Sequence, residues 1–133
     1  EAVSGCDIVI TSGPILKTPH ATIQVGWLEE GSFVSCVDFD SYWSRSALQE
    51  ADKWTTDHRD QYNYYKHQLG FFQDCPEVYA ELGELVTGKL KGRETAAEKT
   101  FAANLGLAMD DMTVAPLIYR RALEKKIGTW LPL

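Results

Sequence analysis

The sequence lacks the features that mark several large classes of protein. Its 133 residues include three cysteines, an odd number spread widely along the chain, so neither a disulfide framework nor a zinc site is indicated. No apolar run approaches the roughly 20 residues that cross a bilayer, and no charged and apolar leader is present. We therefore expect no metal, no membrane segment and a reducing, cytoplasmic location.

Basic clusters are also missing. The formal net charge is -6 at pH 7, whereas a protein that binds nucleic acid or anionic lipid carries a basic surface, so we expect neither partner. There is no internal repeat, low-complexity tract or linker to divide the chain. With 44% hydrophobic residues, the sequence predicts one globular domain with a real core.

Short apolar runs that end in turn residues predict strands at residues 6–11, 33–38, 53–56 and 100–105. Helical patterns between and after these strands predict helices at residues 19–28, 44–50, 58–69, 76–87 and 107–126. Strands that alternate with helices are typical of an α/β fold, with a parallel sheet and right-handed crossovers.

Three local signals refine the helices. Asp57 and Asp60 are spaced as the N-cap and a first-turn acid of the helix over 58–69. Pro116 should kink the final helix or mark its true start. The opening residues 1–5 resemble the end of a helix with a glycine stop, which predicts that the chain is a piece of something longer.

Chemistry is expected at the end of the run from Phe33 to Asp40. This apolar run ends in two carboxylates, Asp38 and Asp40, and ligands of parallel sheets gather beyond the carboxyl ends of the strands. Loop acids that cap a turn or a nearby helix would give the same pattern. The Ser12-Gly13 break after the first strand is likewise either a ligand-facing turn or an ordinary one. The residues alone leave both questions open.

Several motifs stand in a familiar order and spacing: Gly5-Cys6-Asp7-Ile8-Val9-Ile10-Thr11, Glu81-Leu82-Gly83-Glu84 with Gly88-Lys89 and Gly92-Arg93, Gly106-Leu107-Ala108 with Asp111, and Gly128-Thr129-Trp130. Together they resemble the ornithine cyclodeaminase/mu-crystallin family over nearly the whole chain. The resemblance implies that residues 1–133 form the C-terminal half of an NAD(P)-binding Rossmann domain plus a C-terminal helix. The fold would be a partial, truncated three-layer fold, with a parallel sheet between flanking helices.

Members of this family include ornithine cyclodeaminases, alanine dehydrogenases and ketimine reductases, whose shared chemistry is hydride exchange at an amino-bearing carbon. The resemblance implies an NAD- or NADP-dependent enzyme that acts on an amino acid or a cyclic imine and is a homodimer when intact. It places Asp40 on the family's catalytic acid, which exchanges a proton during the reaction. The residues that it places near the cofactor are Ser12, Gly13, Val37, Asp38 and Gly106.

The sequence departs from the family pattern at two places. Tyr42-Trp43-Ser44 stands where many members have Pro-Gly-Lys, and Ala103-Asn104-Leu105 stands where an acid and Ser-Thr are common, which points to a bulkier or otherwise different substrate. The sequence also contains no Gly-x-Gly-x-x-Gly turn. The pyrophosphate cradle would lie upstream of Glu1, so we expect this chain to hold half a nucleotide site and to bind the cofactor poorly alone.

Two other functions fit the same residues. One is a non-catalytic, NADPH-dependent binding protein of the mu-crystallin type. The other is an inactive fragment whose uncovered sheet edge and helix faces self-associate. Within the leading hypothesis, Asp38 is the rival of Asp40, because extended backbone would place both acids on one face and point Phe39 the other way.

Overall fold

The computed structural model describes residues 2–132 of the chain. At its centre is a sheet of five parallel strands in the order β1-β2-β5-β3-β4. The strands are β1 (Ile8–Thr11), β2 (Phe33–Cys36), β3 (Lys53–Thr56), β4 (Ala80–Glu81) and β5 (Thr100–Ala103). The prediction of an α/β fold with a parallel sheet is confirmed.

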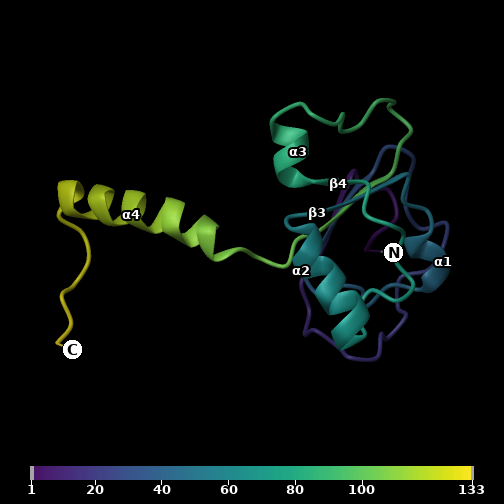
Figure 1. Cartoon of the computed structure of the whole chain (residues 1–133), viewed down its shortest axis with the longest axis horizontal. Helices are drawn as coiled ribbons and strands as arrows, with labels where there is room; N and C mark the ends of the chain where they lie inside the picture. Colours follow the sequence, from purple (N-terminus) through teal and green to yellow (C-terminus); the bar gives the residue numbers. More distant parts are fainter. Residues whose placement is uncertain (1, 133) are drawn as a thin grey trace.

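Helices flank the sheet on both faces, and one further helix extends away from it (Figure 1). The helical elements are α1 (Arg45–Leu48), α2 (Arg59–Tyr64), the π-helical turn η1 (Tyr65–Leu69), α3 (Leu82–Val86) and α4 (Ala108–Lys125). The helices predicted near residues 44–50, 58–69 and 107–126 are thus confirmed within a few residues.

A row of four side chains across the sheet forms the centre of the core. Strand pairing aligns Val9 with Val34, Val34 with Phe101, and Phe101 with Trp54, and all four are buried. The ring centroids of Trp54 and Phe101 lie 5.5 Å apart in a stacked arrangement. α1 and α2 contribute buried residues to the same cluster, so they cover this face of the sheet.

The opposite face of the sheet is covered only in part by the described residues. α3 and the loop after it lie over β3 and β5, where they enclose a cavity of about 180 Å³ that Lys53, Leu85 and Phe101 help to line. Over β1, however, Ile8 and Ile10 are 62% and 63% exposed. Exposed apolar surface of this kind is typical of interaction sites.

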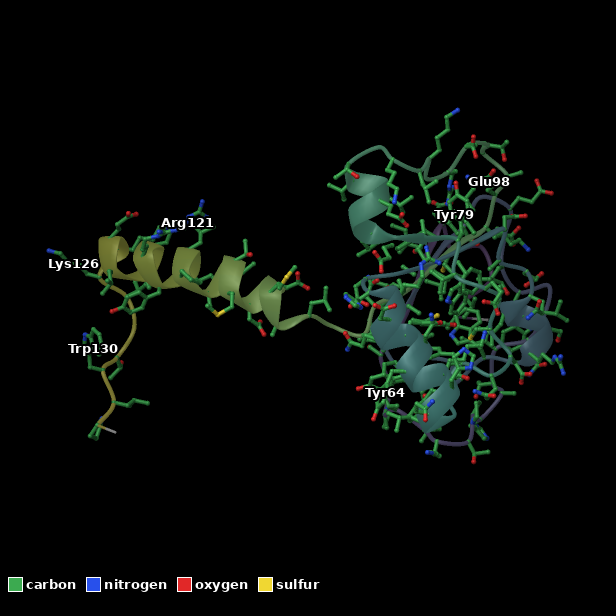
Figure 2. All side chains as sticks on the ribbon, in the orientation of Figure 1. Tyr64, Tyr79, Glu98, Arg121, Lys126 and Trp130 are labelled. Carbon is green, nitrogen blue, oxygen red and sulfur yellow. The ribbon has the colours of Figure 1, made fainter. Side chains whose placement is uncertain are left out.

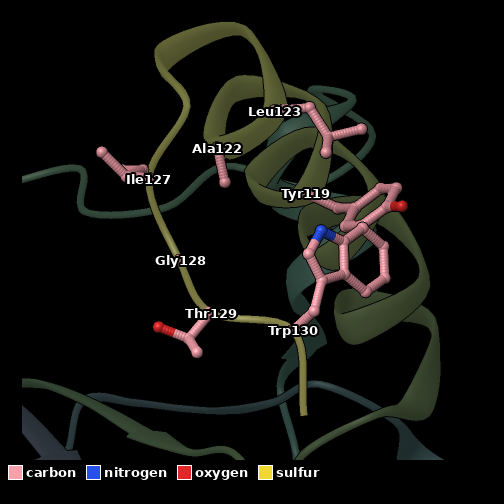
Figure 3. A pocket seen from close by; sticks show the side chains of 7 residues that line it. All are labelled: Tyr119, Ala122, Leu123, Ile127, Gly128, Thr129 and Trp130. Carbon is pink, nitrogen blue, oxygen red and sulfur yellow. The ribbon is translucent and has the colours of Figure 1, made fainter. Parts of the chain in front are cut away.

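α4 has a similar unpartnered character. Figure 2 shows its side chains projecting from a helix that lies apart from the rest of the chain. Large apolar residues such as Met112, Ile118 and Leu123 are at least half exposed. The tail then turns back so that Trp130 lies beside Tyr119, around a hollow of about 220 Å³ (Figure 3). Among residues 2–132, no helix combines the length and apolar character needed to cross a membrane.

The helix predicted over residues 19–28 is wrong. This segment is irregular, and the backbone N–H of Ile23 donates to the carbonyl of Tyr42 at 2.8 Å. Ile23 also forms an isolated parallel bridge with Trp43. Gly26 has a φ of 80°, which a right-handed helix does not allow. In a helix, the backbone groups of this segment would pair with one another. Here they pair with a loop that is distant in sequence.

The helix predicted from Pro76 begins only at Leu82. Before it, the N–H of Tyr79 donates to the carbonyl of Trp54 at 2.8 Å, and β4 pairs with β3. The chain stays extended until Glu81 and Glu84 form a capping box that starts α3. The edge strand β4 was missed because it has only two residues, which lie within the helical spacing of Val78, Leu82 and Leu85.

Other boundaries also differ from the predictions. β1 starts two residues late, and β2 and β5 each end two residues early, at Cys36 and Ala103. Pro116 lies inside α4, so it does not mark the start of that helix. Residues 4 and 5 form a turn, and Gly5 has a φ of 78°, the left-handed conformation of a glycine stop. Glu1 lies outside the described residues.

Candidate functional site

The carboxyl ends of the parallel strands bring the predicted site residues to one edge of the sheet. Thr11 of β1 pairs in register with Cys36 of β2, so the turns that follow these two strands are neighbours. β2 lies between β1 and β5, and Gly106 comes shortly after the end of β5. Ser12, Gly13, Val37 and Gly106 are exposed at this edge, whereas Asp38 and Asp40 are buried.

Asp38 is a clamp between the first two strands. Its Oδ1 accepts a hydrogen bond from the hydroxyl of Thr11 at 2.5 Å, and its Oδ2 accepts one from the backbone N–H of Gly13 at 2.9 Å. The Asp38 residue is only 1% exposed. Its carboxylate therefore has two donors of its own and fixes the turn that contains Ser12 and Gly13.

Tyr42 closes the same turn from the other side. Its hydroxyl donates to the carbonyl of Pro14 at 3.2 Å. A Cβ atom on Gly13 would lie 2.6 Å from the ring of Tyr42, closer than real contacts allow. An alanine at position 13 would thus have to displace the ring of Tyr42, a residue at which the sequence departs from the family pattern.

Asp40 occupies a different environment. Extended backbone does not persist after β2, because Phe39 has a φ of 64°, and so Asp38 and Asp40 do not share partners. Oδ2 of Asp40 accepts the backbone N–H of Phe72 at 3.0 Å, and Phe72 itself has a φ of 57°. Oδ1 is buried and has no hydrogen-bond partner among residues 2–132.

The chemical state of Asp40 follows from these contacts. Burial raises its pKa above the ordinary value; the N–H groups of Asp40 and Phe72 oppose the rise, and the carboxylates of Asp74 and Asp38 add to it. Burial also raises the pKa values of Tyr62 and Cys75, so neither side chain is ionised near neutral pH. Burial therefore shifts Asp40 toward its protonated form, the direction that suits a general acid.

Asp57 belongs to the same edge, although the sequence predicted only an N-cap there. The N-cap of α2 is His58, whose Nδ1 accepts the N–H of Gln61 at 3.2 Å. Oδ2 of Asp57 instead accepts the backbone N–H of Gly106 at 2.6 Å. The available signal was that Asp57, like Asp38, comes within two residues of the end of a strand.

The edge offers no evident metal site. Among residues 2–132, no group of three or more His, Cys, Asp or Glu side chains is placed to hold an ion. What the edge does present is a pair of backbone turns, at Gly13 and Gly106, each with a glycine whose N–H is bound to a carboxylate. The roles of Asp40 in catalysis and of the other residues in cofactor binding stay predictions.

Comparison with known proteins gives consistent relatives. The sequence model of the ornithine cyclodeaminase/mu-crystallin family matches residues 1–126. An N-((2S)-2-amino-2-carboxyethyl)-L-glutamate dehydrogenase from Staphylococcus aureus is 34% identical over 100% of this chain and 40% of its own.

Two solved structures share the fold and some of the sequence. One is the Thermococcus litoralis Delta(1)-pyrroline-2-carboxylate reductase in complex with NADH and L-proline, with 27% identity and a TM-score of 0.71 over 98% of this chain and 42% of that one. The other is an archaeal alanine dehydrogenase dimer with bound NAD, with 25% identity and a TM-score of 0.68 over 96% of this chain and 41% of that one. The chain thus spans about 40% of the length of the relatives that it matches.

Proposed function

Since the chain belongs to the ornithine cyclodeaminase/mu-crystallin family, we propose that it forms part of an NAD(P)-dependent oxidoreductase that acts on an amino acid or a cyclic imine. The observation that carries this proposal is the carboxyl edge of the sheet. There, a buried acid with a raised pKa, Asp40, lies at the same edge as two glycine loops held by other carboxylates. Relatives that bind NADH or NAD and act on alanine or a pyrroline carboxylate support this assignment.

NAD or NADP would supply the hydride acceptor or donor when bound. The residues of this chain that would hold it are Ser12, Gly13, Val37, Asp38 and Gly106. Glycine turns suit this task because they let the backbone approach a ligand closely. The Gly-x-Gly-x-x-Gly cradle is absent from this sequence, so we place it in the remainder of a longer polypeptide. Residues 1–133 would then be the C-terminal half of the Rossmann domain plus the C-terminal helix.

In this proposal Asp40 moves the proton while Asp38 holds the site in place. Conversion between an amine and an imine requires a proton to leave or reach the nitrogen or an attacking water. Oδ1 of Asp40 is buried and has no partner among residues 2–132, so in this proposal it is the oxygen that carries the proton. Both carboxylate oxygens of Asp38 accept hydrogen bonds, from Thr11 and Gly13, so its role in this proposal is to position the turn.

Substitution of Asp40 in the intact protein tests the proposal. Asp40→Asn is nearly isosteric, retains an acceptor for the N–H of Phe72 and removes the titrating group. We expect turnover to fall at least ~100-fold with the affinity for NAD(P)H nearly unchanged, because a positioned acid/base typically contributes ~10²- to 10⁴-fold. Asp38→Asn is the matched control, with a smaller loss of turnover and a larger loss of stability. Wild-type turnover in Asp40→Asn would refute the catalytic role.

A non-catalytic NADPH-binding protein is the second candidate, and the burial of Asp40, which is 4% exposed, favours it. Assays of the intact protein with amino acids and cyclic imines separate the two, because a binding protein would retain NADPH affinity without turnover. A third outcome, self-association of an inactive chain, is favoured by the exposed apolar residues of β1 and α4. We also propose that the intact protein is a homodimer, which the dimeric alanine dehydrogenase relative supports. A cytoplasmic location is a separate proposal, which rests on the few, widely spaced cysteines of the sequence.

A further inference from the structure

β3 is flanked by two carboxylates that make equivalent contacts at opposite edges of the sheet. At the amino edge, Asp52 precedes β3, and its Oδ2 accepts the backbone N–H of Lys99 at 2.8 Å. At the carboxyl edge, Asp57 follows β3, and its Oδ2 accepts the backbone N–H of Gly106 at 2.6 Å. Each acid thus ties β3 to one end of β5, but only Asp57 does so at the candidate site.

Asp57 is held in its orientation from several sides. Its Oδ1 accepts the N–H of His58 at 2.9 Å. The preceding residue, Thr56, is fully buried, and its hydroxyl donates to the carbonyl of Ala103 at 2.8 Å. These bonds fix the end of β3 against the end of β5, so the Asp57 carboxylate meets Gly106 from a rigid base.

Gly106, which donates to Asp57, has a backbone conformation that favours glycine. Its φ is 90°, a region that glycine adopts readily and that other residues avoid. A Cβ atom built on Gly106 would meet nothing within 4 Å, so the glycine is required by its backbone conformation and the space beside it is open. Gln61 supports the same residue weakly, with its Nε2 at 3.5 Å from the Gly106 carbonyl. Asp57 therefore sets the direction in which the Gly106 peptide faces the open edge.

We propose that Asp57 is a positioning residue that holds the Gly106 turn in the conformation that receives the dinucleotide. The inference rests on the proposed function, in which Gly106 contacts NAD(P). Asp57 need not touch the cofactor, because both of its oxygens are engaged with backbone N–H groups. Its effect on binding would be transmitted through the Gly106 peptide.

The test compares Asp57→Ala with Asp52→Ala in the intact protein. Each substitution removes a charge-assisted bond between β3 and β5. Asp57→Ala also removes the bonds from the His58 N–H and the Thr56 hydroxyl, so we expect it to lower stability more than Asp52→Ala does. We expect Asp57→Ala to raise the KM and the Kd for NAD(P)H at least ~10-fold, with kcat changed less than ~3-fold. Asp52→Ala should leave the KM and Kd within ~2-fold of wild type. Fluorescence titration gives the Kd without turnover.

Two further measurements distinguish the positioning of Gly106 from a general loss of stability. Hydrogen exchange at the Gly106 amide should accelerate in Asp57→Ala and stay unchanged in Asp52→Ala. Asp57→Asn, which keeps an acceptor, should recover part of the cofactor affinity and serves if Asp57→Ala does not fold. The inference is overturned if the alanine variants shift the Kd equally or if Asp57→Ala leaves it unchanged. If wild-type protein binds no NAD(P)H, the proposed function fails and this inference fails with it.

Discussion

Replacing Asp38 with alanine should destabilise the 133-residue chain more than replacement of an exposed acid. Asp38 is 1% exposed and accepts hydrogen bonds from the Thr11 hydroxyl and the Gly13 N–H. Alanine removes both bonds and leaves two donors near a newly formed gap. The turn after β1 then loses its tie to β2.

The expected magnitude follows from these two bonds. A hydrogen bond to a charged group contributes about 1.5–3 kcal/mol. Gly13 is exposed, so water can reach its N–H after the substitution, and we take the lower end of the range for each bond. The sum is a loss of about 3 kcal/mol. Since domains of this size have free energies of unfolding of about 5–15 kcal/mol, the variant should still fold.

Urea unfolding, followed by tryptophan fluorescence, measures this loss. With a denaturant slope of about 2 kcal/mol per molar, a loss of about 3 kcal/mol lowers the midpoint by roughly 1.5 M. Asp7→Ala is the control, because Asp7 is exposed and surface substitutions usually change stability by less than about 0.5 kcal/mol. If Asp38→Ala unfolded at the same urea concentration as Asp7→Ala, the clamp would have no energetic role.

Two further predictions concern stability at the same edge. Burial raises the folded-state pKa of Asp40 above the ordinary 3.8, so its contribution to stability is present below that value and is lost as the pH rises through the folded pKa. The free energy of unfolding of wild type, measured against Asp40→Asn, should therefore decline over that pH range in urea titrations; a pH-independent difference would contradict the burial effect. Gly13→Ala should cost about 1 kcal/mol by displacing Tyr42 from its bond to Pro14, and a double-mutant cycle with Tyr42→Ala should remove that cost. An undiminished cost in the Tyr42→Ala background would mean that the strain lies elsewhere.

Patterns of apolar residues predicted the sheet because burial is governed by composition over short windows. β3, for example, was predicted at its observed residues 53–56, since Trp54, Thr55 and Thr56 favour a strand and Asp57 closes it. The helix over residues 19–28 was predicted from weak spacing and does not form. There the backbone pairs with Tyr42, a residue distant in sequence, and no local window contains that partner.

The site shows the same division between local and long-range information. Sequence position alone placed Asp38, Asp40 and Gly106 at the carboxyl edge, because strands that run parallel end at the same edge. Sequence position could not predict which of the two acids has both carboxylate oxygens in hydrogen bonds. Asp38 and Asp40 differ in their donors, Gly13 and Phe72, and those donors arrive from segments 25 and 32 residues away.

The amino-acid sequence by itself determined the α/β class, the parallel strands and the edge at which polar residues collect, because each depends on local periodicity and turn chemistry. Tertiary structure alone decided that Asp38 is a clamp, that Asp40 is a buried acid with a raised pKa, and that Asp57 reaches across to Gly106 instead of capping α2. The reason is physical. The partners and pKa of a carboxylate depend on donors, burial and charges within a few ångströms, and the chain brings these together only when it folds.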